Sequence, residues 1–356
     1  MKLRVVVCGT TFGRVYLKAI ANLKEDFQLV GILARGSQTA RECAEEYNVP
    51  LFTCVNELEK KEIDLACVVI RSTIVGGQGT LLTQQLLDKG IDVIQEHPVY
   101  YDDLIDCYRL AKKNNCSYYI NSFYPDIITM RKFIEIAHKL VNSHQILYLE
   151  ASCSIQVLFP MIDIIGKTLK VFSSWDLKKV NMEINNYNVT LLSGNIKKIP
   201  VLLKVFDQMN PSDPDNLTPF FHSITLQSNV GRLLITDTHG DVLWQPNMYV
   251  PRNDNKVLDM FGENKYVKRH AIEKVYSLTG FSLQELFAVV WPESIQHILL
   301  KFKEKNQHNN SFINEMQCML STCQIWKNIS SHLVENQTSH DAIIGSLTLN
   351  EIMKER

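Results

Sequence analysis

The feature that most constrains the fold of this chain is a regular alternation of two kinds of segment up to about residue 120. Short apolar stretches rich in β-branched residues are each followed by a stretch with helical periodicity. One apolar stretch, residues 63–71, is almost uniformly hydrophobic, which is typical of a central strand in a parallel sheet. The alternation predicts right-handed β–α–β units and therefore an N-terminal, doubly wound parallel sheet of the Rossmann type.

The pattern changes after about residue 125. One helix is followed by segments that alternate between apolar and polar residues, and residues 221–246 read as a hairpin that turns at His239, Gly240 and Asp241. We expect an α+β second domain with an open, mostly antiparallel sheet, then helices from about residue 267 to 331. The predicted domains are residues 1–124 and 125–356, with a tail from about residue 335 that is mobile or wraps around the second domain.

Composition limits the classes of partner. The 356 residues carry a net charge of -1, so neither nucleic acid nor an anionic membrane is expected as the main partner. No apolar run approaches the roughly 20 residues that span a bilayer, and no signal peptide is recognisable, so we expect a cytoplasmic protein. The nine cysteines show neither CxxC pairs nor zinc-ligand spacing. They are interpreted as core thiols, and no metal is predicted.

The first predicted turn, CGTTFGRVYL, resembles a phosphate-binding turn that lacks one glycine. Gly9 permits a tight turn, and Gly13 opens a helix whose free backbone N–H groups attract pyrophosphate. Thr11 stands where the middle glycine of G-x-G-x-x-G is expected. We predict that Gly9, Thr10, Thr11, Phe12 and Gly13 contact a dinucleotide. An ordinary strand–helix turn without a nucleotide stays open as the alternative.

The end of the second predicted strand indicates which dinucleotide the site would bind. Sites for NAD usually place Asp or Glu there, but the segment LARGSQTAR has no acid. A guanidinium group suits the 2′-phosphate of NADP, and a carboxylate would repel it. The sequence therefore favours NADP over NAD, with Arg35, Gly36, Ser37 and Arg41 as predicted contacts. A solvated basic helix start is the alternative.

Further candidates follow three other strands, at the carboxyl edge where such sheets bind ligands. Arg71 and Ser72 follow the central strand and are expected on the cofactor side. The next strand ends in QEHPVY, where Glu96 and Pro98 are predicted cofactor contacts and His97 a proton donor, unless His97 is structural. After the last strand of the series, NSFYP places Tyr124 on the same rim, either as a proton donor or as part of a pocket wall.

These segments together resemble the glucose–fructose oxidoreductase/inositol dehydrogenase-like family. That family usually has lysine where this chain has His97, and a histidine three residues before an aspartate in the second domain. Here Asp163 is present, but Pro160 stands at the expected histidine position. The resemblance implies that Asp163 contacts the substrate. The two altered positions argue against oxidation of a polyol hydroxyl, which needs a base.

One branch of that family fits better. The segments CGTTFGRVYL, ARGS, EHPV, NSFYP and GRLLITDTHGDVLWQPNMYVP are similar to thiazolinyl imide (imine) reductases of siderophore biosynthesis, of the yersiniabactin and pyochelin type. The resemblance covers about residues 1–330. It implies NADPH as cofactor, reduction of a thiazoline C=N to a thiazolidine, and a proton from His97 or Tyr124.

The resemblance also implies the partners. The substrate would be tethered to the carrier domain of a nonribosomal peptide synthetase, with Arg252 and Lys256 among the candidate contacts, and the protein would be a homodimer through the exposed sheet. Two other functions stay open: a non-catalytic regulator that senses dinucleotides, and an NADP-dependent sugar or cyclitol dehydrogenase with a divergent acid–base set.

Overall fold

A computed structural model of the chain describes residues 2–70, 77–180, 189–209, 213, 218–307, 313–333, 336–337 and 346–354. The predicted contacts Arg71 and Ser72 lie outside the described residues. None of the described helices combines the length and the apolar character that crossing a membrane requires.

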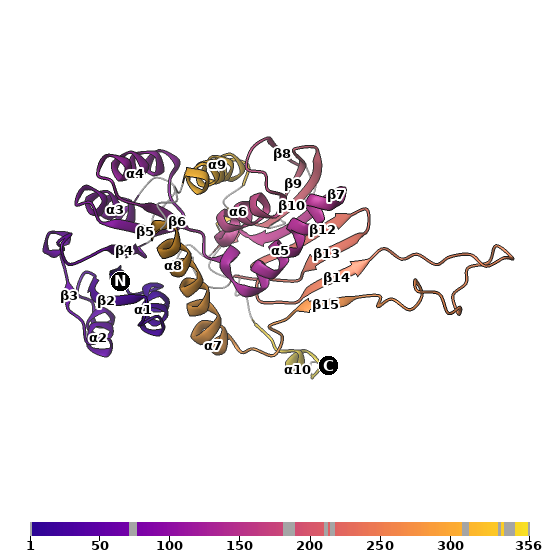
Figure 1. Ribbon diagram of the computed structural model, residues 1–356, viewed down its shortest axis with the longest axis horizontal. Coiled ribbons are helices and arrows are strands. Elements are labelled where there is room, and N and C mark those ends of the chain that lie inside the picture. Colours follow the sequence, from indigo (N-terminus) through magenta and orange to yellow (C-terminus); the bar gives the residue numbers. More distant parts are fainter. Residues whose placement is uncertain are drawn as a thin grey trace.

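The first domain is built on a six-stranded sheet with the order β3-β2-β1-β4-β5-β6 (Figure 1). All neighbouring strands are parallel. The strands are β1 (Leu3–Cys8), β2 (Phe27–Leu33), β3 (Leu51–Phe52), β4 (Leu65–Val68), β5 (Asp92–Glu96) and β6 (Tyr118–Asn121). The helices between them are α1 (Gly13–Asn22), α2 (Gln38–Glu46), α3 (Gln78–Asp88) and α4 (Tyr101–Lys113), with a 3₁₀ turn at Val55–Glu57.

This strand order confirms the predicted Rossmann fold. The order of the strands reverses between β1 and β4, because β2 and β3 lie on one side of β1 and β4 to β6 lie on the other. In sheets of this kind, ligands bind at the carboxyl ends of the strands on either side of that point. The apolar residues of β1 and β4 are buried because helices cover both faces of the sheet. As a result the residues that follow β1, β5 and β6 meet at one edge.

The second domain contains an eight-stranded sheet with the order β15-β14-β13-β12-β7-β10-β9-β8. Among the described strands of this sheet only β7 and β10 pair in parallel, which confirms the predicted open and mostly antiparallel sheet. The strands are β7 (Ile146–Ser154), β8 (Trp175–Lys179), β9 (Val189–Ile196), β10 (Ile199–Phe206), β12 (His222–Ser228), β13 (Gly231–Ile235), β14 (Val242–Pro246) and β15 (Glu273–Tyr276). Helices α5 (Ile128–Ser143) and α6 (Leu158–Leu169) lie on one face of the sheet, and 3₁₀ turns at Tyr124–Asp126 and Ile155–Val157 precede them (Figure 1).

The last helices return to the first domain. A short helix α7 (Leu283–Glu285) and a π-helical turn (Leu286–Val290) lead into α8 (Trp291–Gln307), which packs on α1. Helix α9 (Ile313–Ser330) packs against α4 and α6 (Figure 1). Beyond it, β16 (Asn336–Gln337) pairs with β11 (Gln208–Met209), and α10 (Leu349–Ile352) is the last described helix.

Two sequence predictions, for residues 221–246 and for the chain from residue 267, were incomplete. The chain is not helical from residue 267, because β15 first adds an edge strand beside β14. Four residues at a sheet edge are too few to show a period. Residues 221–246 form three strands rather than one hairpin, with a second turn at Asn229 and Val230. Between β14 and β15, residues 247–272 extend far from the body of the protein (Figure 1).

Candidate functional site

The turn after β1 has the geometry of a pyrophosphate site. Gly9 has a φ of +99°, and a Cβ atom there would lie 2.6 Å from the carbonyl oxygen of Val69. Helix α1 begins at Gly13, no side chain caps it, and no acidic residue occurs in its first turn. The first backbone N–H groups of a helix have no partner within it and favour an anion. These residues therefore fit a dinucleotide even though Thr11 replaces the middle glycine.

The end of β2 provides a second anion-binding feature. Gly36 has a φ of +78°, and Ser37 caps α2 by accepting a hydrogen bond from the backbone N–H of Ala40 over 3.3 Å. Arg35 and Arg41 are exposed on either side of this cap. In the described part of the chain neither guanidinium group has an ion-pair partner, and the first turn of α2 contains no acid. The geometry fits a phosphate at this position.

The neighbours of His97 determine which of its two ring nitrogens always carries a hydrogen. Its Nδ1 atom lies 3.1 Å from Oε1 of Glu96 and 3.1 Å from the carbonyl oxygen of Asn121. Both partners are acceptors, so Nδ1 carries a hydrogen whether the ring is neutral or charged. The exchangeable proton of His97 is therefore the one on Nε2. The imidazole stacks on the ring of Phe159, with 5.6 Å between the ring centres.

Glu96 is fixed behind His97 by two residues that the sequence did not single out. One carboxylate oxygen accepts hydrogen bonds from the Tyr16 hydroxyl and, over 3.0 Å, from the side-chain amide of Asn121. Burial and the charge of Glu96 raise the pKa of Tyr16 well above its usual value, which keeps that phenol a donor. Glu96 was predicted as a cofactor contact, but its hydrogen bonds join it to His97, Tyr16 and Asn121. Asn121 stood in the quoted segment NSFYP, and its position at the end of β6 was the available signal.

Tyr124 lies beside His97, as the shared strand edge predicts. The centres of the two rings are 6.1 Å apart. The Tyr124 ring also contacts His222 at 4.9 Å and Phe221 at 5.6 Å between centres. Phe123, which precedes it, adopts a φ of +58° and donates its backbone N–H to the Asn121 side chain over 2.8 Å. The two predicted proton donors thus come together at the junction of the two domains.

The surroundings of Asp163 differ from those of His97 and Tyr124. Its side chain is 1% exposed, accepts a hydrogen bond from Ser122 and forms an ion pair with Lys167. Although burial opposes it, the carboxylates of Asp163 and Asp126 hold the pKa of Lys167 above its usual value. The expected substrate contact of Asp163 has no support from these surroundings, because the carboxylate faces the interior. The position of a residue in a predicted helix does not reveal which face of that helix other elements will bury.

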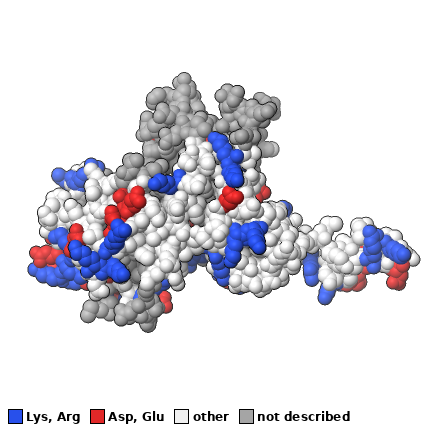
Figure 2. Space-filling view, turned by 90° about the horizontal axis from the view of Figure 1, so that it is seen from above, with Lys and Arg blue, Asp and Glu red and all other residues white. Residues whose placement is uncertain are grey.

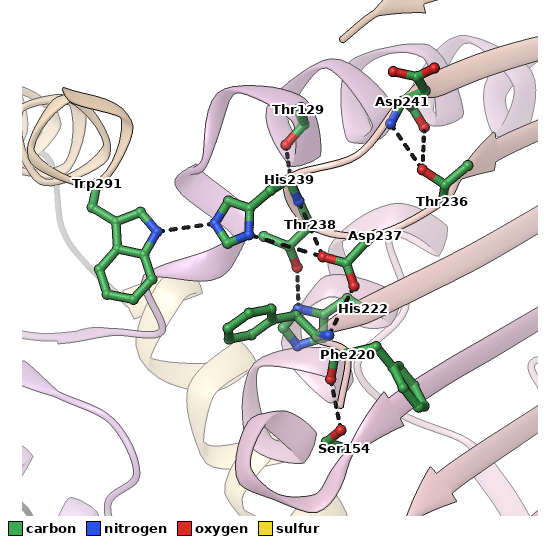
Figure 3. Close-up of polar contacts among 11 residues, drawn as sticks. Thr129, Ser154, Phe220, His222, Thr236, Asp237, Thr238, His239, Asp241 and Trp291 are labelled. Atoms are coloured by element: carbon green, nitrogen blue, oxygen red, sulfur yellow. Dashed lines mark hydrogen bonds and ion pairs between the residues drawn. The ribbon is translucent and has the colours of Figure 1, made fainter. Parts of the chain in front are cut away.

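A further group of aromatic residues connects the two domains. The Trp291 ring lies 5.6 Å from Phe12 of the phosphate turn and 5.3 Å from Phe123, measured between centres. The Trp291 indole N–H donates to Nε2 of His239 over 3.0 Å (Figure 3). The start of α8 therefore links the nucleotide turn to the β13–β14 hairpin. Sequence reasoning had used His239 only as a turn residue and had not selected Trp291.

Two histidines of this group are neutral at ordinary pH. Burial lowers the pKa of His222 to about 3 and that of His239 to about 4. His222 donates from Nε2 to the Val157 carbonyl over 2.9 Å, and its Nδ1 lies 2.7 Å from the Thr238 hydroxyl (Figure 3). Both nitrogens are occupied, so His222 supports the site and is not a source of protons. His97 is left as the histidine with an exchangeable proton next to Tyr124.

Within the described ranges, no three His, Cys, Asp or Glu side chains come close enough to hold a metal ion. Of the nine cysteines, Cys54 is exposed, whereas most of the others are buried as expected.

Two family models match the chain in sequence. Residues 3–122 match the model described as "Oxidoreductase family, NAD-binding Rossmann fold". Residues 144–245 match the model described as "Thiazolinyl imine reductase Irp3-like, C-terminal". No curated protein sequence matches the chain significantly.

Solved structures share the fold over nearly the whole chain. The UDP-N-acetylglucosamine 3-dehydrogenase of Acidithiobacillus ferrooxidans superposes with a TM-score of 0.66 at 11% identity, covering 94% of this chain and 98% of that one. A levoglucosan dehydrogenase in complex with NADH and levoglucosan has a TM-score of 0.67 at 10% identity, with 93% and 97% covered. An oxidoreductase from Vibrio cholerae has a TM-score of 0.65 at 12% identity, with 93% and 99% covered. At these identities the similarity establishes the fold alone.

Proposed function

We propose that this chain, which belongs to the oxidoreductase family with an NAD-binding Rossmann fold and has a C-terminal domain of the thiazolinyl imine reductase type, is an NADPH-dependent thiazoline reductase. It would reduce the C=N bond of a thiazoline to a thiazolidine on a siderophore intermediate. The observation that carries the proposal is the fixed tautomer of His97, with Nδ1 bound to two acceptors and Tyr124 at its side.

The chain's own residues would bind the cofactor at two places. The amides at the start of α1 would hold the pyrophosphate, and the exposed guanidinium groups of Arg35 and Arg41 would bind the 2′-phosphate. When bound, the nicotinamide supplies a hydride to the thiazoline carbon. Phe12 lies beside Trp291, so aromatic side chains would line this end of the site.

The thiazoline nitrogen needs one proton as the hydride reaches the carbon. The imidazolium form of His97 can donate that proton from Nε2, because Nδ1 stays bound to Glu96 and Asn121. The carboxylate of Glu96 would accept the Nδ1 hydrogen throughout this step. Tyr124 is the alternative donor at the same rim. The charges balance, since the substrate gains one hydride and one proton and His97 or Tyr124 is reprotonated by solvent.

We further propose that the substrate is delivered by the carrier domain of a nonribosomal peptide synthetase and that the protein acts in the cytoplasm. A tethered substrate requires that the site be reached from outside by a flexible arm. The candidate contacts Arg252 and Lys256 are both exposed, and the Arg252 guanidinium donates to the Lys256 carbonyl over 2.6 Å.

The test is a turnover assay with purified protein, NADPH and a thiazoline thioester that mimics the carrier-bound group. Oxidation of NADPH with one equivalent of thiazolidine formed is the expected result, and NADH should react more slowly. A protein that binds NADPH tightly but consumes none with any thiazoline would be a dinucleotide sensor instead.

A sugar or cyclitol dehydrogenase is the second candidate, because two structural neighbours with sugar substrates share the fold. It would be supported by reduction of NADP⁺ in the presence of polyols or nucleotide sugars. The same His97 would then act as a base from its neutral form, in which Nε2 has no proton. Assays of NADPH oxidation with a thiazoline and of NADP⁺ reduction with a polyol, both on the same preparation, separate the imine reductase from the dehydrogenase.

A further inference from the structure

The backbone just before Tyr124 adopts a rare and strained conformation. Phe123 has a φ of +58° and a ψ of -64°, and the backbone N–H of Tyr124 donates to the Ser122 carbonyl over 2.7 Å. A hydrogen bond between residues two apart, with a positive φ between them, defines the strained form of the γ-turn. Bulky residues such as phenylalanine avoid this region of backbone space, so the surrounding structure must hold the turn in place. We call residues 121–126 the Tyr124 loop.

Two side-chain hydrogen bonds hold the strained turn. The side-chain oxygen of Asn121 accepts from the backbone N–H of Phe123 over 2.8 Å. The hydroxyl of Ser122, which is buried, donates to a carboxylate oxygen of Asp163 on α6. The first bond lies within the loop, whereas the second reaches a helix of the second domain. The Ser122 hydroxyl therefore connects the turn to α6.

The carboxylate that accepts from Ser122 is itself fixed in place. Figure 2 shows Asp and Glu side chains at the surface of one face of the protein, but Asp163 is buried at 1% exposure. The Lys167 ammonium, one turn further along α6, pairs with the same carboxylate oxygen that accepts from Ser122. A buried carboxylate is costly without such partners. The packing of α6 therefore determines where the acceptor of the Ser122 hydroxyl lies.

The other end of the Tyr124 loop is anchored to a different helix. Oδ1 of Asp126 lies 3.0 Å from Nδ1 of His297 on α8. Although burial opposes it, the hydrogen bond with His297 holds the pKa of Asp126 below its usual value, which keeps this carboxylate an acceptor. Helix α8 packs on α1, which begins at the nucleotide turn. The loop is thus attached to α6 at one end and, at the other end, to a helix that packs on the first domain.

We propose that Asp163 is a positioning residue for Tyr124. By accepting from Ser122 it keeps the strained turn that places the tyrosine ring beside His97, with 6.1 Å between the ring centres. A displacement of about 1 Å in a reacting group can lower the rate about 10²-fold, so a strained turn at this place needs an anchor. The effect on catalysis rests on the proposed function, but the placement of the ring does not. The role differs from a substrate contact, because Asp163 acts through the turn without touching the reacting atoms.

The first experiment reads the placement of the ring without any substrate. With 3-fluorotyrosine in place of Tyr124, the ¹⁹F NMR signal of the otherwise unchanged protein should be a single narrow line. Ser122→Ala removes the hydroxyl that holds the turn, so the line should shift and broaden. Ser228→Ala is the matched control and should leave the line unchanged, because that buried hydroxyl donates to the Gly231 carbonyl over 2.7 Å in the β12–β13 turn. An unchanged line in Ser122→Ala overturns the proposal.

The second experiment measures NADPH oxidation with a thiazoline thioester. We expect Ser122→Ala to lower kcat about tenfold or more, while KM for NADPH changes by less than about twofold. In a Tyr124→Phe background the same substitution should cause no further loss, since residues that act as a unit are not additive. An equal loss in both backgrounds overturns the proposal, because Ser122 would then act independently of Tyr124. If the wild type reduces no thiazoline, the proposed function fails, and the ¹⁹F result still tests the placement of the ring.

A third experiment tests Asp163 itself. The double variant Asp163→Leu/Lys167→Met removes the acceptor and both charges, and replacing a buried ion pair by apolar residues of similar volume often preserves the fold. The ¹⁹F line of the fluorotyrosine should shift and broaden as it does in Ser122→Ala. A line that matches the unsubstituted protein overturns the proposal, because the turn would then hold its shape without Asp163.

Discussion

The Nδ1 atom of His97 lies 3.1 Å from Oε1 of Glu96, its immediate neighbour in the sequence. That carboxylate is held from behind by Tyr16 and Asn121. It therefore directs Nε2 of His97 to be the nitrogen that exchanges protons. In the proposed reaction Glu96 is a positioning residue for His97.

The variant Glu96→Gln tests that role. A glutamine keeps the shape of the side chain but can turn its N–H group toward Nδ1 of His97, so that the hydrogen on Nδ1 is no longer enforced. At neutral pH kcat should fall about tenfold, with KM for NADPH nearly constant. An unchanged kcat would remove Glu96 from the mechanism.

The variants His97→Ala and Tyr124→Phe identify the proton donor. Loss of a general acid should lower kcat about 10²–10⁴-fold, because the thiazoline nitrogen would then take its proton from water. Binding of NADPH, followed by fluorescence titration, should change by no more than about twofold in either variant. If only one substitution lowers kcat, that residue is the acid. If neither does, the proton comes from elsewhere.

Arg35→Ala tests the assignment of the 2′-phosphate. Removing one charged hydrogen-bond donor should raise KM for NADPH about tenfold or more, while KM for NADH stays the same, because only NADPH carries the phosphate. Arg109→Ala is the matched control, since that exposed arginine pairs with Asp106 on α4. Equal effects of Arg35→Ala on both cofactors would contradict the assignment.

The depressed pKa of His222 predicts how stability depends on pH. Burial lowers this pKa to about 3 in the folded protein, whereas an unfolded histidine titrates at about 6.5. The unfolded state therefore binds more protons between these values, and the free energy of unfolding falls as pH falls below about 6.5, by about 1.4 kcal/mol per pH unit for this group.

His222→Gln should make that decline shallower, because glutamine can still donate to the Val157 carbonyl but cannot become charged. Urea unfolding between pH 7 and pH 4 measures the slope directly. His270→Gln, at an exposed position within residues 247–272, should follow the wild-type curve. Parallel curves for wild type and His222→Gln would show that His222 is not the group responsible.

Trp291→Phe tests the link between the domains. Phenylalanine keeps an aromatic ring beside Phe12 but leaves Nε2 of His239 without its donor. The expected loss in the free energy of unfolding is about 1–3 kcal/mol, as for a buried acceptor that loses its partner. A double-mutant cycle with His239→Ala should give a coupling energy of about 1 kcal/mol. Additive effects would mean that the hydrogen bond contributes nothing.

The amino-acid sequence by itself determined the class of fold and the edge of the sheet that carries the site. Alternation of β-branched and amphipathic segments is a local property, so it predicted the succession of strands β1 to β6 along the chain without knowledge of any contact. Parallel strands all end at the same edge, and this rule placed His97 and Tyr124 together before their 6.1 Å separation was known. Gly9 was recognisable because a tight turn of this kind demands glycine.

Tertiary structure alone decided what surrounds those residues. The hydrogen bond from Asn121 to Tyr16 joins positions 105 residues apart, and the one from Trp291 to His239 joins positions 52 apart. Hydrophobic periodicity in the sequence does not predict such pairs, because they depend on how separate elements pack. The same holds for Asp163, which helix packing buries, and for residues 247–272, whose large apolar side chains the fold leaves exposed.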